Sequence, residues 1–247
     1  MTPMVALARQ PAFGTSPPAP RPAACGAIAV AGAALLADCS GALYWPDERT
    51  LIVADLHLEK GSAFAERGML LPPYDTAETL ARLGAVIARH DPRLVVALGD
   101  NFHDGGGVTR LLPQDRATLA GLQHSRDWVW IAGNHDPDPA AGIGGAFAAV
   151  VALGPLAFRH EPTAGRCDGE IAGHLHPRAR VSLRGRAIAR RCFATDGSRL
   201  VMPAFGAYAG GLDIGDRAFR RVFGSTSFDV HLIGARRTYA FAAAACL

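Results

Sequence analysis

Hydrophobic residues along the chain fall into short runs, and their pattern changes at about residue 147. In the first half, continuous apolar runs over 51–54, 94–98 and 128–132 predict strands buried on both faces. Residues 75–90 carry apolar positions at helical spacing, with Asp75 as the expected N-cap. Residues 113–123 also predict a helix, because Pro113 is tolerated in a first turn.

The remaining segments predict more strands around this strand–helix–strand unit. Residues 26–44 predict a strand meander, 61–74 an irregular crossing, and 142–151 a helix or strand of the core. After residue 147, short apolar runs separated by Gly, Asp-Gly and Pro turns predict antiparallel strands over 153–160, 170–174, 179–183, 200–202 and 228–233. Together these elements predict two packed sheets with helices outside.

Composition limits the class of protein. Of 247 residues 49% are apolar, enough for a sizeable core in one domain, which we expect over 25–247. Residues 1–24 contain six prolines and predict a flexible leader outside the core. The five scattered cysteines lack a Cys-x-x-Cys pair and indicate reduced thiols. Without an apolar stretch of about 20 residues, we expect no membrane association and a cytoplasmic location.

Polar residues follow each of the three apolar strands in the first half. Asp55 and His57 follow the first, Gly99-Asp100 the second, and Gly133-Asn134-His135 the third. We expect Asp55 and His57 to share one side of an extended segment. Because the carboxyl ends of strands in such a sheet line one crevice, these side chains are expected to meet there.

Three more histidines follow in the second half. His160 ends an apolar run, and His174 and His176 are spaced to share one side of an extended segment. Each residue alone has an ordinary structural explanation, but the complete order indicates a metal centre. Carboxylate, imidazole and amide ligands suit Mn²⁺, Zn²⁺ or Fe²⁺ better than Cu⁺ or Ca²⁺.

The succession Asp-Leu-His, Gly-Asp, Gly-Asn-His-Asp, a single His and Gly-His-Leu-His over residues 51–205 resembles the calcineurin-like metallophosphoesterase superfamily. The resemblance implies an α/β (α+β) fold, a four-layer αββα double β-sandwich flanked by helices. It also implies two divalent metal ions, most plausibly Mn²⁺ and otherwise Zn²⁺ or Fe²⁺. One ion would be held by Asp55, His57 and His176, and the other by Asn134, His160 and His174, with Asp100 bridging both.

The same resemblance implies hydrolysis of phosphoesters. Two such ions lower the pKa of a shared water, so that hydroxide attacks phosphorus in line. Asn134 and His135 would contact the phosphate, and His135 would protonate the leaving oxygen. Asp104 is expected to orient His135, although phosphoprotein phosphatases place this acid three residues after the bridging Asp, where this chain has His103. That difference, and Gly-Asn-His-Asp in place of Gly-Asn-His-Glu, argues against a phosphoprotein phosphatase.

Residues 54–62, 98–104 and 160–162 resemble the bacterial ligase-associated DNA damage response endonucleases, the PdeM branch. This resemblance implies a Mn²⁺-dependent phosphodiesterase or endonuclease acting on DNA. Its partners would be an ATP-dependent DNA ligase, an Lhr-type helicase and a β-lactamase-fold exonuclease. Arg178 and Arg180 follow His176 closely and could contact a phosphate backbone, but a solvated sheet face in an arginine-rich protein explains them as well.

Two other functions are compatible with the same fold. One is a small-molecule phosphodiesterase or pyrophosphatase, acting on substrates such as UDP-diacylglucosamine or dinucleoside polyphosphates. A lipid substrate would require an apolar flap or membrane-binding helix. The other is a scaffold that keeps the fold without catalysis, a role that retention of the whole ligand set argues against.

Overall fold

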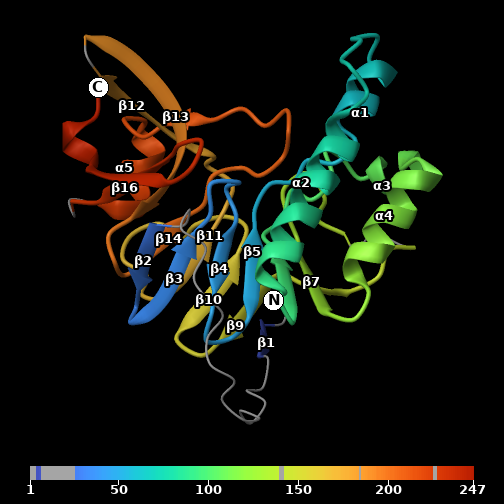
Figure 1. Ribbon diagram of the computed structural model, residues 1–247, viewed down its shortest axis with the longest axis horizontal. Coiled ribbons are helices and arrows are strands. Elements are labelled where there is room, and N and C mark those ends of the chain that lie inside the picture. Colours follow the sequence, from blue (N-terminus) through green and yellow to red (C-terminus); the bar gives the residue numbers. More distant parts are fainter. Residues whose placement is uncertain (1–3, 7–25, 139–141, 184, 225–226) are drawn as a thin grey trace.

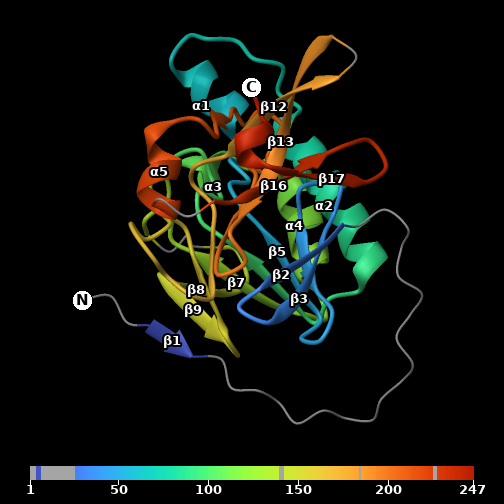
Figure 2. The same ribbon diagram turned by 90° about the vertical axis from the view of Figure 1, so that its left-hand side faces the viewer.

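The computed structural model describes residues 4–6, 26–138, 142–183, 185–224 and 227–247, which form two β-sheets. The first sheet has seven strands in chain order: β2 (Gly26–Val30), β3 (Ala33–Ala37), β4 (Leu43–Trp45), β5 (Thr50–Val53), β6 (Leu94–Ala97), β7 (Asp127–Ile131) and β8 (Ala146–Ala148). Figures 1 and 2 show the two sheets stacked against each other.

The second sheet has a less regular strand order. Its path runs β1 (Met4–Ala6), β9 (Val150–Leu153), β10 (Leu156–Arg159), β11 (Glu170–Ala172), β14 (Leu200–Val201), β13 (Arg186–Thr195), β12 (Pro177–Leu183) and β15 (Leu212–Asp213). Two further strands extend it from β13, namely β16 (Asp229–Ile233) and β17 (Thr238–Ala242). The long β12–β13 hairpin projects beyond the rest of the sheet (Figure 2).

Three apolar clusters hold four layers together. Side chains of both sheets meet in the central cluster, which includes Ile52 of β5 and Phe193 of β13. A second cluster joins the first sheet to α2 (Asp75–His90) and α4 (Pro113–Gln123). A third packs α5 (Arg217–Phe223) on the outer face of the second sheet. This arrangement confirms the predicted double sandwich flanked by helices (Figure 1).

Strands β5, β6 and β7 are parallel neighbours at the centre of the first sheet. Strand β5 is buried along its whole length: Ile52 faces the other sheet, whereas Leu51 and Val53 face α2. Apolar side chains are therefore needed on both faces, which explains the continuous run in the sequence. Because the three strands are parallel, the polar residues that follow them lie at one edge of the sheet.

Several elements differ from the sequence predictions. Residues 60–66 form helix α1 (Lys60–Glu66) instead of an irregular crossing, and a short helix α3 (Gly107–Arg110) follows β6. Helix α2 has the predicted bounds, but Tyr74 occupies its N-cap position. The Asp75 carboxylate instead accepts a hydrogen bond from the Gly61 amide, because the start of α1 packs against it.

The second half is less purely antiparallel than predicted. Pairs β10–β11, β11–β14 and β12–β15 are parallel. Helix α5 was not predicted, although Phe219, Val222 and Phe223 give it a buried face. Of the predicted leader, Met4–Ala6 pairs with β9, and the other residues up to 24 lie outside the described residues. No helix of the described chain is long and apolar enough to cross a membrane.

Candidate metal centre

The predicted ligands lie in tight turns after the strands, not in extended segments. Asp55 (φ 53°), His57 (φ 44°) and Asp100 (φ 46°) have left-handed backbones, as do His174 (φ 68°) and His176 (φ 47°). Such conformations cost energy in residues other than glycine, and they cluster at functional sites. The expectation that Asp55 and His57 share a strand face was therefore wrong, because β5 ends at Val53 and the chain turns at once.

Glycines let these turns approach one another. A Cβ atom on Gly133 would lie 2.0 Å from the Asp100 backbone nitrogen, and one on Gly173 would lie 2.7 Å from Asp55 Oδ2. A Cβ atom on Gly99 would lie 2.7 Å from the His160 ring. Side chains at these three positions would separate the turns that carry the ligands.

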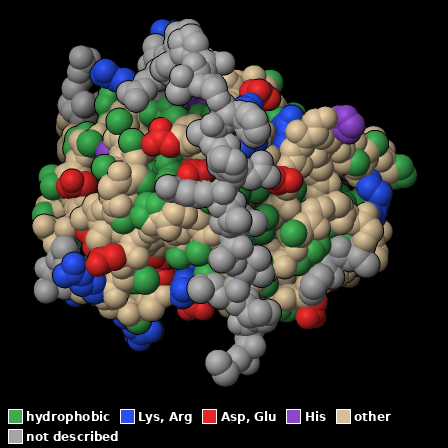
Figure 3. Space-filling model, turned by 90° about the horizontal axis from the view of Figure 1, so that it is seen from below, with side chains coloured by type: hydrophobic (Ala, Val, Ile, Leu, Met, Phe, Trp, Pro, Cys, Tyr) green, Lys and Arg blue, Asp and Glu red, His purple; other side chains and the backbone are tan. Residues whose placement is uncertain are grey.

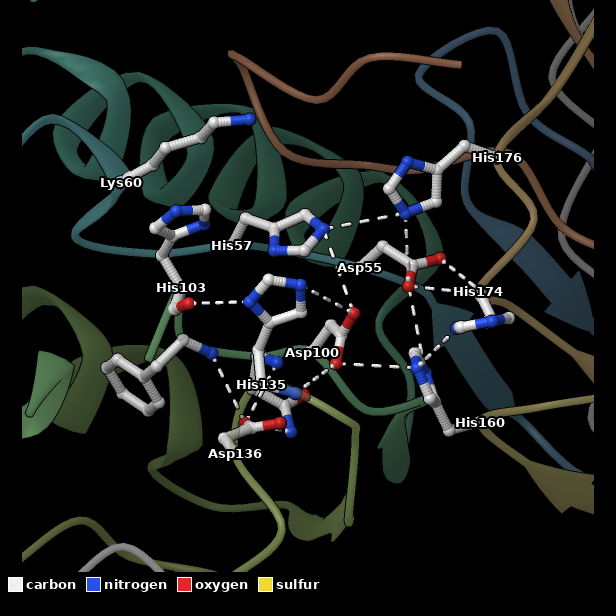
Figure 4. Close-up of polar contacts among 12 residues, drawn as sticks. Asp55, His57, Lys60, Asp100, His103, His135, Asp136, His160, His174 and His176 are labelled. Carbon is white, nitrogen blue, oxygen red and sulfur yellow. Dashed lines mark hydrogen bonds and ion pairs between the residues drawn. The ribbon is translucent and has the colours of Figure 1, made fainter. Parts of the chain in front are cut away.

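Asp55, His57 and His176 form the first group of possible metal ligands. Their donor atoms all lie within 4.8 Å of one another. His176 Nε2 is 3.3 Å from Asp55 Oδ1 and 3.4 Å from His57 Nε2 (Figure 4). Burial, and after it the charge of His176, lowers the pKa of His57 to about 3. The imidazole is therefore neutral at pH 7 and can offer a lone pair to a cation.

Asp100, His160 and His174 form the second group, also with donor atoms within 4.8 Å. His160 Nε2 lies 3.3 Å from Asp100 Oδ1 and 3.1 Å from His174 Nδ1. His160 Nδ1 donates to the Leu98 carbonyl at 2.8 Å, which leaves Nε2 to face the centre. Metal-binding histidines typically have such a second partner, since it fixes the tautomer and the ring.

Asp100 lies between the two groups. Its Oδ1 faces His160, and its Oδ2 is 4.0 Å from His57 Nε2 in the first group. Burial opposes ionisation of Asp100, but His160, the His135 amide and His57 together lower its pKa.

The chemistry of the donor set fits cations. Asp55 is fully buried and Asp100 is 3% exposed. Their described contacts are histidines and backbone amides, with no lysine or arginine among them. Buried carboxylates are costly without a compensating positive charge. The His/Asp groups therefore fit a dinuclear metal site.

His135 lies at the open side of this centre. Its side chain is 44% exposed, and Nε2 is 3.9 Å from Asp100 Oδ2. Nδ1 lies 2.7 Å from the His103 carbonyl, so this nitrogen donates and Nε2 faces the centre. The predicted orienting residue, Asp104, has other partners in the described chain: Arg110 Nη2 at 2.6 Å and the Gly106 amide at 2.9 Å. Arg110 of α3 holds the Asp104 carboxylate, and the orienting role of Asp104 stays a prediction.

The other predicted residues are placed less closely. Asn134 is exposed between Gly133 and His135, and its role as a metal ligand stays a prediction. Arg178 and Arg180 are exposed on β12 and alternate with buried Ala179, so they share a face as predicted. Their role in substrate binding remains a prediction.

Sequence reasoning missed the functional environment of His103. Together with His57 and His135 it forms a third group whose donor atoms lie within 4.8 Å. The His103 ring stacks on that of His135 with centroids 5.2 Å apart. Burial, then Lys60 and His135, lower the pKa of His103. Its position three residues after Asp100, where a carboxylate was expected, was the available signal.

Comparison with known proteins agrees with this geometry. A family model described as calcineurin-like phosphoesterase matches residues 48–181, the span that contains all three histidine groups. No curated protein matches significantly. The crystal structure of Pseudomonas putida nuclease MPE is 29% identical, with a TM-score of 0.65, over 88% of this chain and 100% of that chain. The E. coli phosphoesterase Yfce is 14% identical over 78% of this chain and 98% of that chain, with a TM-score of 0.38.

The family match and the metal-ligand groups bear on the same residues. The family model spans 134 of 247 residues, more than half of the chain, and the match with a nuclease agrees with the branch indicated by the sequence motifs. The chain is therefore a metal-dependent phosphoesterase that belongs to the calcineurin-like phosphoesterase family.

Proposed function

We propose that this chain is a phosphodiesterase that cleaves DNA. The observation that carries the proposal is the pair of His/Asp groups with Asp100 between them and His135 exposed beside them. The similarity to a protein named as a nuclease supports a polynucleotide substrate. The first group of ligands would be Asp55, His57 and His176; the second would be Asp100, His160 and His174, with Asn134 added from the sequence motif.

Manganese is the proposed metal, with Zn²⁺ or Fe²⁺ as alternatives that the same donors suit. Two such ions would supply hydroxide near neutral pH and neutralise charge on the phosphate oxygens. His135 then serves as the general acid: the His103 carbonyl fixes its Nδ1, so an Nε2 proton can pass to the leaving oxygen. The half-exposed ring leaves room for a large substrate.

A role in ligase-associated DNA repair extends the proposal and is supported by the motif resemblance alone. In that role, an ATP-dependent DNA ligase, an Lhr-type helicase and a β-lactamase-fold exonuclease would be its partners in the cytoplasm. Co-purification from cells that express these proteins tests the association separately from the chemistry.

The direct test is Mn²⁺-dependent cleavage of single-stranded and duplex oligonucleotides, with bis-p-nitrophenyl phosphate as a diester that lacks bases. We expect Asp100→Ala and His174→Ala to abolish cleavage of all three substrates. His124→Ala is the matched control, because His124 is exposed at the end of α4. Full activity in both site variants would refute a metal-dependent diesterase, and an enzyme active on the small diester but inactive on DNA would refute the polynucleotide substrate.

One observation favours a second candidate, a pyrophosphatase for a lipid-linked nucleotide. The segment between α1 and α2 exposes Met69 (50%), Leu70 (89%) and Tyr74 (67%), which is the apolar flap such a substrate requires. Tyr208 ties this segment to the loop beside the site, since its hydroxyl donates to the Pro72 carbonyl at 2.9 Å. Faster hydrolysis of an acylated UDP-sugar than of any oligonucleotide would favour this candidate.

A further inference from the structure

A pocket of about 430 Å³ lies between α2, the β12–β13 hairpin and the loop 203–211. Its walls carry four arginines, and small residues of the loop 206–210 form much of the remaining surface; we call it the arginine pocket. The arginines are Arg82, Arg178, Arg190 and Arg191. No carboxylate is among the described residues that line it. Its volume falls within the range of about 300–1,000 Å³ that is usual for ligand sites.

Arg191 lines the pocket together with Arg82 and Arg178. Burial, followed by the charges of Arg82 and Arg178, lowers the pKa of Arg191 to about 10. Arg191 is held by the protein itself, since Nη1 donates to the Ala204 carbonyl at 2.6 Å. Its charge remains, and like charges gathered in a hollow without a carboxylate favour an anion.

Arg82 of α2 lies in the wall of the arginine pocket. Its guanidinium lies over the Phe205 ring, 4.9 Å from the centroid, which fixes its place in the wall. Nε and Nη2 of Arg82 are buried and have no hydrogen-bond partner in the described chain. Burial lowers the pKa of Arg82, and Glu78, one helical turn earlier, offsets part of that effect. Buried donors are normally bonded, so the Arg82 charge stands in this wall without a hydrogen-bond partner at these two nitrogens among the described residues.

Arg178 lines the pocket and lies two residues after the predicted ligand His176. Its chain packs so closely on Gly211 that a Cβ there would lie 2.1 Å from Arg178 Cδ. The loop that floors the pocket and strand β15, which follows it, are each bonded to ligand-bearing backbone. The Gly206 amide donates to the Asp55 carbonyl at 3.1 Å, and the Leu212 amide donates to the His176 carbonyl at 3.0 Å. An occupant of the pocket would therefore neighbour a phosphate held at the centre.

We propose that the arginine pocket binds a second phosphate of a polynucleotide substrate, next to the one that is cleaved. The inference rests on the proposed function and adds the residues that select a polynucleotide over a simple diester. Guanidinium groups suit this task because their paired N–H donors match phosphate oxygens. By contrast, acidic, basic and hydrophobic side chains are interspersed over the coloured face seen in Figure 3.

The test compares Arg82→Met and Arg178→Met with wild-type enzyme on an oligonucleotide and on bis-p-nitrophenyl phosphate, which has no second phosphate. We expect KM for the oligonucleotide to rise about tenfold in each variant, the effect of one lost charge-assisted hydrogen bond. Hydrolysis of the small diester should stay within about twofold, which also shows that the variants fold. The salt dependence of binding should weaken by about 0.7 in the log–log slope for a single strand.

Arg220→Met is the matched control. Arg220 is exposed on α5, and Phe219 of α5 belongs to the same apolar cluster as buried Ala179, which alternates with Arg178 along β12. Oligonucleotide kinetics should not change in this variant. Arg82→Lys keeps a charge but loses the paired donors, so its KM should fall between those of wild type and Arg82→Met.

The outcomes separate this inference from the proposed function. Unchanged oligonucleotide KM in both variants, with wild-type cleavage intact, overturns the pocket but not the diesterase. If wild-type enzyme cleaves no DNA, anisotropy of a labelled oligonucleotide in EDTA decides: weaker binding in both variants supports the pocket, and equal binding overturns it. The inference is also overturned if inorganic phosphate changes the rate of small-diester hydrolysis in wild-type enzyme but not in Arg82→Met, because the pocket then binds a free anion.

Discussion

Replacing Gly133 by alanine tests how the turns of the metal centre depend on close backbone approach. The added Cβ would lie 2.0 Å from the Asp100 nitrogen and 2.4 Å from Asp100 Oδ1, whereas real Cβ contacts stay beyond 3.0 Å. The ends of β6 and β7 must therefore separate by about 1 Å. A displacement of about 1 Å at an active site costs on the order of 100-fold in rate. Overpacking of this kind costs about 1–3 kcal/mol of unfolding free energy.

The assay is kcat for bis-p-nitrophenyl phosphate with saturating Mn²⁺, together with urea unfolding of both proteins. Gly121→Ala is the control, because Gly121 lies in α4 with nothing within 4 Å of an added Cβ. That substitution should leave the rate unchanged and raise the unfolding free energy by up to about 1 kcal/mol. Wild-type kcat and stability in Gly133→Ala would refute the reasoning, since Asp100 would then tolerate the displacement.

Three further predictions address other parts of the molecule. His135→Asn should lower kcat about 10²- to 10⁴-fold on an oligonucleotide but much less on a p-nitrophenyl ester, whose leaving group needs no proton; equal losses on both would contradict the general-acid role. Arg199→Met removes the fully buried ion-pair partner of Glu170 and leaves it the part-exposed Arg159 at 3.4 Å, so the unfolding free energy should fall by about 3 kcal/mol. Arg166→Met, in an exposed pair with Asp168, should change it by less than about 1 kcal/mol; similar melting temperatures in the two variants would show that burial does not matter here. Burial lowers the pKa of His231 below its ordinary 6.5, so the unfolded chain binds protons more readily than the folded chain just below pH 6.5. The unfolding free energy therefore decreases as the pH is lowered below 6.5. Urea unfolding at a series of pH values should show a smaller decrease in His231→Gln than in wild type.

Much of the fold could be predicted because burial shows directly in the sequence. Strands β5 and β6 are apolar on both faces, and the spacing of Leu80, Leu83 and Val86 gave α2 its bounds. Helix α1 was missed because Lys60–Glu66 buries just Gly61 and Ala63, too few apolar positions for a periodic signal. The parallel pairing of β11 with β14 joins residues about 30 apart in the chain, and such pairing is set by packing of the whole sheet.

The candidate site could be predicted in its residue types more than in its geometry. The order of Asp55, His57, Asp100, His160, His174 and His176 indicated a shared centre, and the structure brings these six side chains together. The left-handed backbones of five of them, all but His160, could not be foreseen, because residues other than glycine adopt this conformation under tertiary constraint. The partner of His135 was missed for a related reason, since a backbone carbonyl has no sequence signature. Arg110 reaches Asp104 from a short helix that was not predicted.

In the proposed function, Asp100 joins the two metal-binding groups into one centre. Electron paramagnetic resonance during Mn²⁺ titration of the metal-free protein tests it most directly, with bound metal counted in parallel. We predict two Mn²⁺ per chain with a spin-coupled signal, and loss of that coupling in Asp100→Ala. A single uncoupled Mn²⁺ per chain at full phosphodiesterase activity, unchanged in Asp100→Ala, would contradict the account.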